Sequence, residues 1–591
     1  MNNIRITVGM GSCGIASGAQ TIYDALNKGI SAKKVKHAAV YKTGCIGICK
    51  YEPIVEVYKN NKRTTYINVK VEDVKKIIDI DLIGNKVLTD CAINNVNHSI
   101  IDEEFYSRQT RIALKNCGSV DPTNIEEYIK YKGYKALKKV LSSMSSETVI
   151  DEVKKSGLRG RGGAGFKTGM KWELAYKSVS EVKYVCCNAD EGDPGAFMDR
   201  AILEGDPHSV IEAMIIAAYA IGSKHGYIYV RAEYPLAVER LKIAIDQAKK
   251  HNFIGKKILG TDFSFELEIR LGAGAFVCGE ETALIASIEG KRGEPRLRPP
   301  FPTTSGLFNQ PTLLNNVETY ANIPKIILEG SSWFNKIGTE NSKGTKVFAL
   351  GGKINTTGLV EVPIGTSLNE IIYNIGGGIP NQKKFKAAQT GGPSGGCIPA
   401  SHIDIKMDYE TLSEIGSMMG SGGLIIMDED TCMVDIAKFF LDFTVDESCG
   451  KCIPCRLGTK KVYDMLCDIT DGKFKVEDLS KLKDLAMHVK TTSFCGLGQS
   501  ATNPVISTLR YFEDEYLEHI QTKKCRAKVC KNLLTYTIEK DKCAGCSMCA
   551  KNCPVNAIKG EIKHPYEINQ ELCIKCGTCI NNCKFSAISK L

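Results

Sequence analysis

The chain has 591 residues, too many for one hydrophobic core, so several domains are expected. Hydrophobic residues make up 43% and charged residues 24%, and no apolar run approaches the ~20 residues of a spanning helix, which argues against a fibrous, disordered or membrane-embedded protein. The net charge of +10 comes with no nucleic-acid-binding motif; it suits either a solvated basic surface or attraction for anionic dinucleotides and acidic partners.

Residues 1–88 have the pattern of a small α/β domain, in which the short alternating runs predict strands. Strands are expected at 4–8, 36–41 and 54–58, and helices at 18–28 and 71–78. Residues 89–150 are polar and helical in pattern, with Asn94-Asn95 and Asp121-Pro122 as breakers, and are predicted to form a connecting arm.

The middle of the chain alternates strand and helix patterns between glycine-rich loops, which predicts an α/β domain with a mostly parallel sheet over 151–335. Strands are expected at 184–187 and 227–230, and helices at 207–220 and 237–249. A small α+β module is expected at 336–430, a helical region at 431–520, a basic hinge at 521–540 and a cysteine-rich tail at 541–591.

The loop over 157–166 contains five glycines and precedes Lys171. Such a loop lets backbone N–H groups approach a phosphate or a flat ring without interference from side chains. Three further polar or glycine-rich segments accompany it, at 187–195, 272–282 and 315–319. None of the four matches a Walker A loop, so ATP chemistry is not expected.

The 25 cysteines cluster by spacing, which favours metal sites over disulfides and predicts a reducing, anaerobic cytoplasm. The tail repeats CxxCxxCxxxC twice, the ligand spacing of two 4Fe-4S clusters in which the fourth cysteine of each run binds the other cluster. One cluster is expected on Cys543, Cys546, Cys549 and Cys583, and the other on Cys573, Cys576, Cys579 and Cys553. Zinc or disulfides are the alternatives, but zinc knuckles do not usually repeat this spacing twice.

His519, Cys525 and Cys530 lie within a dozen residues of one another, and an imidazole with two thiolates suits structural zinc. Cys467 is the expected fourth ligand. Unliganded thiols beside a surface histidine are the alternative. Cysteines without ligand spacing, Cys432 among them, are expected to be small buried apolar residues.

The four central segments carry a family resemblance. Residues 151–515 resemble the flavin-bearing, NADH-oxidising subunit of respiratory complex I, and the whole chain resembles the beta subunit of electron-bifurcating iron-only hydrogenases and their formate dehydrogenase and transhydrogenase relatives. The resemblance implies a multidomain α/β and α+β protein. Its parts would be a thioredoxin-like domain at 1–88, a Rossmann-like FMN and NAD(P) domain at 151–335, a ubiquitin-like SLBB module at 336–430, a helical bundle with a 4Fe-4S cluster at 431–520 and a ferredoxin-like domain at 541–591.

The resemblance also implies the binding residues. FMN would be held by Gly160, Arg161, Gly162 and Lys171 (the last at the phosphate), by Asn188, Asp190 and Glu191 along the flavin, and by Gly279, Glu280, Glu281, Asn315, Asn316 and Thr319. The nicotinamide nucleotide would stack over the isoalloxazine beside Gly163, Phe166, Asp193, Phe276, Glu281, Arg298 and Phe301. The third 4Fe-4S cluster, the first one-electron acceptor close to the flavin, would lie on Cys449, Cys452, Cys455 and Cys495, with zinc as the alternative.

Three positions depart from the family's usual residues: Lys167 stands in place of Pro, Phe276 in place of Tyr, and Arg298 in place of Lys. Lys167 and Arg298 add positive charge, which leads to the hypothesis that the chain accepts NADP(H), because a 2′-phosphate prefers a bidentate cation. Neutral drift is the alternative.

Cys13, Cys45 and Cys49 match three of the four ligands of a thioredoxin-like 2Fe-2S domain, and the missing first ligand falls at Val8, which cannot bind iron. Either water, Ser12 or another group completes the site, or the domain has lost its cluster.

These expectations combine into one function. NAD(P)H gives two electrons as hydride, an iron–sulfur cluster takes one, and FMN connects the two processes. Glu191 would tune the flavin or handle a proton, or only make structural hydrogen bonds. Expected partners are a hydrogenase-like or formate dehydrogenase-like catalytic subunit, a small thioredoxin-like 2Fe-2S subunit and ferredoxin, in a hetero-oligomer. An electron-relay or assembly subunit with an idle flavin pocket is the alternative.

Overall fold

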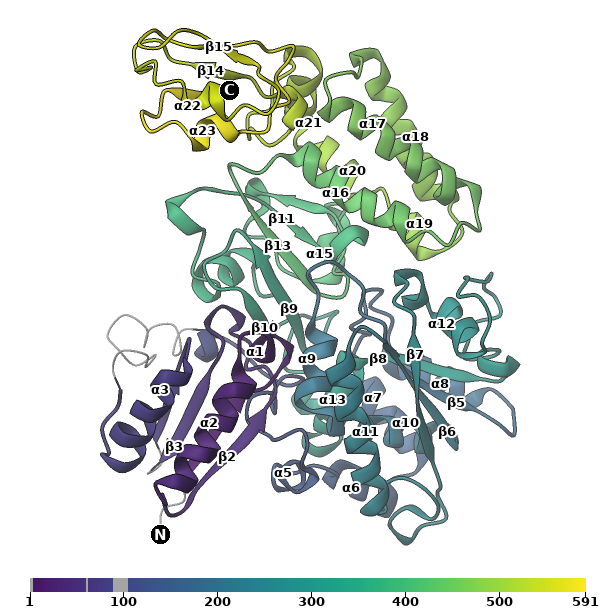
Figure 1. The fold of residues 1–591 in the computed structure, drawn as a ribbon. Coiled ribbons are helices and arrows are strands. Elements are labelled where there is room, and N and C mark those ends of the chain that lie inside the picture. Colours follow the sequence, from purple (N-terminus) through teal and green to yellow (C-terminus); the bar gives the residue numbers. More distant parts are fainter. Residues whose placement is uncertain (1–3, 60–61, 89–104) are drawn as a thin grey trace. The chain divides into compact units, whose positions relative to one another are not determined.

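The computed structural model describes residues 4–59, 62–88 and 105–591, and the chain divides into two compact units, Met1–Ile426 and Met427–Leu591 (Figure 1). Within the described parts of the chain, no helix combines the length and the apolar character needed to cross a bilayer.

The first unit begins with a four-stranded sheet of order β2-β1-β3-β4. Its strands are β1 (Ile4–Gly9), β2 (Ala38–Thr43), β3 (Val55–Lys59) and β4 (Lys62–Tyr66). β1 runs parallel to β2 and antiparallel to β3. Helices α2 (Ala19–Ala32) and α3 (Val71–Lys76) bury their apolar faces in the same core as alternate residues of β1, such as Ile6 and Val8.

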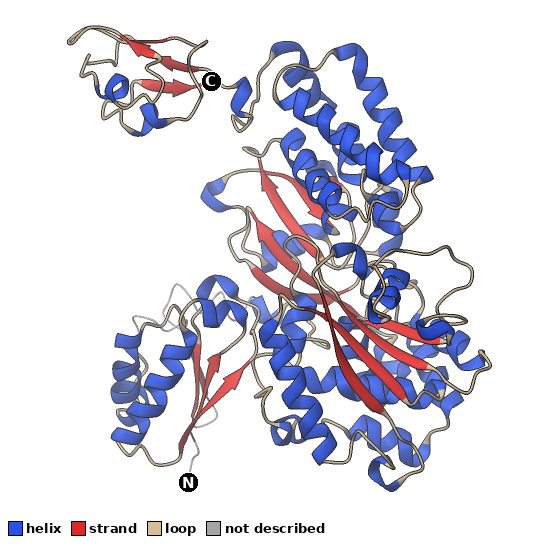
Figure 2. Ribbon diagram, turned by 45° about the vertical axis from the view of Figure 1, so that its right-hand side comes forward, coloured by secondary structure: helices blue, strands red, loops and turns tan. Residues whose placement is uncertain are grey.

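The central sheet has the order β7-β6-β5-β8, and all three of its neighbouring pairs are parallel, as the strand–helix alternation predicted (Figure 2). Its strands are β5 (Tyr184–Ala189), β6 (His225–Arg231), β7 (Glu266–Gly272) and β8 (Thr312–Asn316). Helices α10 (Pro207–Ile221), α11 (Pro235–Lys250) and α13 (Val317–Glu329) pack against it. In register, Asn188 lies opposite Asn316, so β5 and β8 end at the same edge, where ligands of parallel sheets bind.

The described part of the predicted connecting arm contributes to this central core. Helices α5 (Ile125–Lys130), α6 (Lys135–Ser143) and α7 (Ser146–Ser156) bury residues such as Leu137 and Val149 in the same cluster as the sheet. The region therefore packs as part of the α/β domain. The predicted breaker Asn94-Asn95 lies outside the described residues.

Residues 345–428 form a five-stranded sheet of order β10-β9-β13-β11-β12 over its own core. Its strands are β9 (Thr345–Gly352), β10 (Gly358–Pro363), β11 (Phe385–Thr390), β12 (Cys397–Pro399) and β13 (Gly423–Asp428). A short helix, Glu370–Ile375, packs into that core.

The second unit is helical up to its tail. Its main helices are α16 (Met433–Asp446), α17 (Lys460–Thr470), α18 (Leu479–Thr492) and α20 (Asn503–Tyr511). The tail contains two short antiparallel pairs, β14 (Tyr536–Ile538) with β17 (Ile588–Lys590) and β15 (Ile558–Lys559) with β16 (Glu567–Ile568). Two one-turn helices, α22 (Met548–Lys551) and α23 (Thr578–Asn581), follow equivalent cysteines in the two halves.

Candidate functional site

The glycine-rich loop is closed by a hydrogen bond from the Gly160 N–H to the Phe166 carbonyl (2.8 Å). Gly163 and Gly165 have φ values of +121° and +64°, a region that glycine enters without strain. The N–H groups of Gly162, Gly163 and Ala164 donate to no group among the described residues. Successive free N–H groups in such a loop form an anion-binding nest, which fits a phosphate.

The Arg161 side chain points away from this nest. It is fully buried, and its guanidinium donates to the carbonyls of Thr345, Arg159 and Lys343 at 2.6–2.8 Å. The Arg161 N–H donates to the Thr319 hydroxyl (2.9 Å). Arg161 therefore positions the loop, and only its backbone remains to serve the predicted flavin site.

The ends of β5 and β8 meet this loop. A Cβ on Gly162 would lie 3.1 Å from Asn316 Cβ, so glycine permits the close approach. The Asn316 side chain caps α13 through the Thr319 N–H (3.3 Å) and donates to Asp199 (2.5 Å). The Asn188 amide donates to the Gly279 carbonyl (2.9 Å). The structure thus brings together the predicted flavin residues of all four segments.

Glu281 is held between two cations. Lys171 Nζ lies 3.0 Å from its Oε2, and Arg298 Nη1 lies 2.8 Å from its Oε1. Burial alone would raise the pKa of Glu281, but the two cations lower it below its ordinary value. Glu280 instead caps helix α12 (Glu281–Ile288), since its carboxylate accepts from the Thr282 and Ala283 N–H groups.

The aromatic residues predicted to contact the nucleotide differ in their exposure. Phe166 and Phe301 are 49% and 54% exposed, which suits stacking on a planar ring better than core packing. Phe276 is half-buried, and a Cβ on Gly192 would lie 2.8 Å from its ring. Asp193 accepts a hydrogen bond from the Ser421 hydroxyl, and burial raises the pKa of Asp193 to about 6.

Glu191 lies at the first turn of α9 (Met198–Gly205). Its carboxylate accepts the N–H groups of Asp199 and Arg200, both at 3.0 Å, and only 6% of the residue is exposed. Burial raises the pKa of Glu191 to about 6, although the two N–H donors favour the anion. The group can therefore change protonation near neutral pH while its position stays fixed.

The first cysteine cluster of the second unit gathers four predicted ligands. Cys455 is buried in the turn Pro454–Thr459, and Cys449, Cys452 and Cys495 are its neighbouring cysteines. Cys495 caps α19 (Gly496–Ser500), and a Cβ on Gly498 would lie 3.1 Å from Cys455 Cβ, so glycine lets this helix approach the turn. Four thiols around one point are the donor set of a 4Fe-4S cluster.

The tail cysteines line two hollows. The first hollow is lined by Cys543, Cys546, Cys549 and Cys583, and the second by Cys553, Cys573, Cys576 and Cys579. Each hollow takes three thiols from one sequence run and one from the other, the exchange expected from the spacing.

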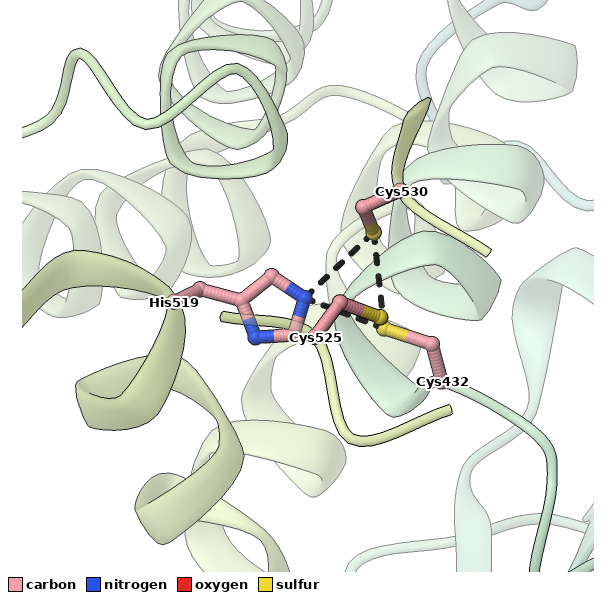
Figure 3. A group of neighbouring side chains, drawn as sticks. All are labelled: Cys432, His519, Cys525 and Cys530. Atoms are coloured by element: carbon pink, nitrogen blue, oxygen red, sulfur yellow. Dashed lines mark hydrogen bonds between the residues drawn. The ribbon is translucent and has the colours of Figure 1, made fainter. Parts of the chain in front are cut away.

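A further donor group lies in the helical part of the second unit. Cys432, His519, Cys525 and Cys530 are all buried, and their ligand atoms lie within 4.8 Å of one another (Figure 3). His519 Nε2 is 3.4 Å from Cys432 Sγ and 3.3 Å from Cys530 Sγ, while Nδ1 faces the Glu515 carbonyl at 2.7 Å. Three thiols and an imidazole form a tetrahedral zinc donor set, and the carbonyl contact leaves Nε2 for the metal.

This group corrects the sequence prediction of Cys467 as the fourth ligand. Cys432, which the sequence assigned to the core, occupies that position, and Cys467 is not part of the group. Cys432 lies 87 residues before His519, just ahead of α16, so no local spacing connects the two.

Comparison with known proteins finds three family descriptions that match separate parts of the chain. The family description "Nuo51 FMN-binding domain" matches residues 153–325, "NADH-ubiquinone oxidoreductase-F iron-sulfur binding region" matches 435–519, and "4Fe-4S dicluster domain" matches 534–587. The chain is 58% identical over 459 residues to the NADP-reducing hydrogenase subunit HndC of Solidesulfovibrio fructosivorans, covering 78% of this chain and 93% of that protein.

Two further relatives extend the comparison. An NADH-quinone oxidoreductase subunit of Aquifex aeolicus is 44% identical over 70% of this chain and 95% of its own length. A solved structure of an NAD+-reducing [NiFe]-hydrogenase has 28% identity and a TM-score of 0.62, covering 88% of this chain and 84% of that one.

The fold, the glycine-lined pocket and the thiol groups define a flavin- and iron–sulfur-dependent oxidoreductase subunit that acts on nicotinamide nucleotides. The chain belongs to the family of FMN- and NADH-binding subunits that occur in NADH-quinone oxidoreductases and NAD(P)-linked hydrogenases. FMN and 4Fe-4S clusters are the cofactors of its matched domains.

Proposed function

We propose that this chain is the diaphorase subunit of a cytoplasmic, multi-subunit hydrogenase, or of a formate dehydrogenase or transhydrogenase relative, and that the whole complex bifurcates electrons. In this proposal FMN exchanges electrons with NAD(P)(H), and three 4Fe-4S clusters pass single electrons onward. The observation that carries the proposal is the convergence of the Gly162–Ala164 nest, Lys171 and Glu191 at the common edge of β5 and β8.

Each group in the pocket has a task that follows from its chemistry. The nest N–H groups and the Lys171 ammonium would bind the FMN phosphate. When bound, FMN supplies the conversion between hydride transfer and one-electron transfer. Phe166 and Phe301 would hold flat rings and exclude water, and Glu191, with its pKa of about 6, would accept or return the proton that accompanies the electrons.

The NADP(H) preference deepens this proposal. Arg298 is 40% exposed at its side chain and is already oriented by Glu281, while Lys167 is exposed and forms no ion pair among the described residues. A 2′-phosphate could recruit both cations. The 58% identity to a subunit named as part of an NADP-reducing hydrogenase supports this preference over neutral drift.

The partners would be a hydrogenase-like or formate dehydrogenase-like catalytic subunit, a small thioredoxin-like 2Fe-2S subunit and ferredoxin. The two hollows of the tail, with four thiols each, would hold the clusters that exchange electrons with these partners. The chain's relatives are named as subunits of larger assemblies, which supports a hetero-oligomer. The chain is rich in thiols and requires a reducing compartment, which supports a cytoplasmic location.

The group Cys432, His519, Cys525 and Cys530 would hold a structural zinc. Its burial and its complete set of four protein donors favour a closed structural site over a catalytic one, which keeps an open position.

One experiment separates an active diaphorase from an electron-relay subunit with an idle pocket. The full chain is purified without oxygen, reconstituted with iron, sulfide and FMN, and tested for bound flavin and NAD(P)H:viologen reduction. We expect stoichiometric flavin and turnover. The Lys171→Met variant should bind FMN at least tenfold more weakly because a charge-assisted bond is lost, while Lys167→Met should bind it normally. A colourless wild-type chain without turnover would favour the relay subunit.

A further inference from the structure

The N-terminal domain contains a thiol group that the flavin chemistry does not use. Cys45 follows β2, Cys49 begins the turn Cys49–Tyr51, and Cys13 lies in the first turn of α1 (Ser12–Ala16). The Cys45 and Cys49 sulfurs are 3.9 Å apart, and Cys13 also interacts with Cys49. Two thiolates on one tetrahedral metal at ~2.3 Å bonds would be separated by about 3.8 Å, so Cys45 and Cys49 suit one ion.

These residues do not fit a cluster with four thiolates. Val8 is fully buried in the domain core on β1 and offers no donor atom. The Ser12 hydroxyl donates to Glu204, whose other oxygen accepts the Ser12 N–H (2.8 Å), so Ser12 is already engaged. Cys117 contacts Gly205 and directs its thiol to the Ala201 carbonyl (3.8 Å).

A carboxyl group occupies the remaining side of the site. Glu52 is 8% exposed, and its neighbours include the Cys45 and Cys13 thiols. A Cβ on Gly9 would lie 3.1 Å from Glu52 Oε1, and one on Gly14 would lie 3.1 Å from Oε2, so the carboxylate fills the space left open by two glycines. Within the described chain, its one hydrogen bond runs from the Ile54 N–H to Oε2 (3.0 Å), which leaves Oε1 for another partner.

The distances between ligand atoms distinguish a site for a single metal ion from a site for a cluster. Among the described residues, Cys432, His519, Cys525 and Cys530 bring all their ligand atoms within 4.8 Å of one another, whereas Cys13, Cys45 and Cys49 are more widely spaced. The cubane cysteines of this chain are likewise spread too widely for one ion. Cys49 lies close to both Cys45 and Cys13, and a set of thiols that is linked in this way but too wide for one ion fits a cluster of two metals, in which two ligands serve each metal.

We propose that Cys13, Cys45, Cys49 and Glu52 hold a two-iron, two-sulfide cluster with three thiolate ligands and one carboxylate ligand. Cys45 and Cys49 bind one iron, and Cys13 and Glu52 Oε1 bind the other. The carboxylate replaces the thiolate that the chain lacks, and its negative charge balances iron as a thiolate would.

The location gives this cluster a direct connection to the flavin domain. Ser12 is bonded to Glu204 in the last turn of α9, and Arg240 of α11 donates to the carbonyls of both Glu204 and Met10. The first turn of the same helix holds Glu191. A helix of eight residues spans about 12 Å, so a one-electron centre here is fixed beside the flavin domain.

The test uses the full chain, reconstituted anaerobically with iron and sulfide and compared with Glu52→Gln, Glu52→Cys and Glu56→Gln. Glu56 is a matched control because it is a buried carboxylate nearby, on β3, that accepts a hydrogen bond from the Tyr58 hydroxyl (2.8 Å). The readouts are iron and sulfide per chain and the EPR spectrum of the reduced protein, recorded warm enough that cubane signals are broadened away.

We expect wild type and Glu56→Gln to show the two-iron signal. Glu52→Gln should lose that signal and about two irons per chain, and Glu52→Cys should keep the iron with altered g values. Retained FMN binding in Glu52→Gln would show that the fold is intact. The proposal is overturned if wild type has no two-iron signal, or if Glu52→Gln keeps the wild-type iron content and g values.

Discussion

Arg298 Nη1 lies 2.8 Å from Glu281 Oε1, so the guanidinium assigned to a nucleotide phosphate is oriented by a carboxylate. The second oxygen of Glu281 binds Lys171, the cation assigned to the flavin phosphate. One side chain therefore orients the cations of both predicted phosphate sites. The single carboxylate therefore offsets only part of the positive charge of the two cations.

Replacing Arg298 should distinguish the two nucleotides. We expect Arg298→Ala to lower kcat/KM for NADPH about tenfold more than kcat/KM for NADH, because a charge-assisted hydrogen bond to the 2′-phosphate contributes ~1.5–3 kcal/mol. Lys291→Ala removes a cation of the same loop that is paired with Glu289 and should affect both nucleotides alike. A wild-type enzyme that clearly prefers NADH would contradict the NADP hypothesis.

Glu191 should give the activity an inflection near pH 6. Burial raises the pKa of this group from 4.5 to about 6, so the carboxylate, which is the proton-accepting form, forms as pH rises through 6. We therefore expect kcat for NAD(P)H:viologen reduction to rise through that range in wild type, and the inflection to be absent in Glu191→Gln. An equal loss at every pH in the variant would instead indicate a purely structural role, through the first turn of α9.

The proposed zinc site predicts a contrast between two cysteines. Cys432→Ser should reduce bound zinc from about one per chain to near zero and lower the melting temperature by several degrees, because metal binding contributes folding free energy. Cys467→Ser should keep the zinc, since Cys467 lies outside the donor group. Zinc loss in Cys467→Ser, or full zinc in Cys432→Ser, would refute the assignment of zinc to the four side chains drawn in Figure 3.

These sites differ in how far the sequence could reveal them, and the difference follows from how local the ligands are. The eight tail cysteines lie in two short runs, so spacing alone predicted which four would line each hollow. Cys432 joins His519 only through the packing of α16, and Glu52 reaches its thiols only because Gly9 and Gly14 lack side chains. Contacts of that kind arise from tertiary structure and leave no periodic signal.

The same limit applies to the direction of side chains. The glycine loop and the central strands β5 and β6 were predictable from pattern, but β7, β8 and the inward turn of Arg161 were not. Strand β4 was also missed, because its run Lys62–Tyr66 begins with four polar residues and forms the sheet edge, where apolar alternation is weak.

The order of electron flow gives the last prediction. If the flavin passes electrons first to the cluster on Cys449, Cys452, Cys455 and Cys495, then Cys455→Ser should leave the bleaching of bound flavin by NAD(P)H intact while viologen reduction falls at least tenfold. Cys579→Ser removes a ligand from one tail hollow and should lower the iron content by about four per chain. This variant should keep flavin bleaching and viologen reduction but lose ferredoxin reduction. Rapid-scanning absorbance at the flavin band, with iron analysis of each variant, separates the steps. Unimpaired viologen reduction in Cys455→Ser would show that electrons leave the flavin without passing through that cluster.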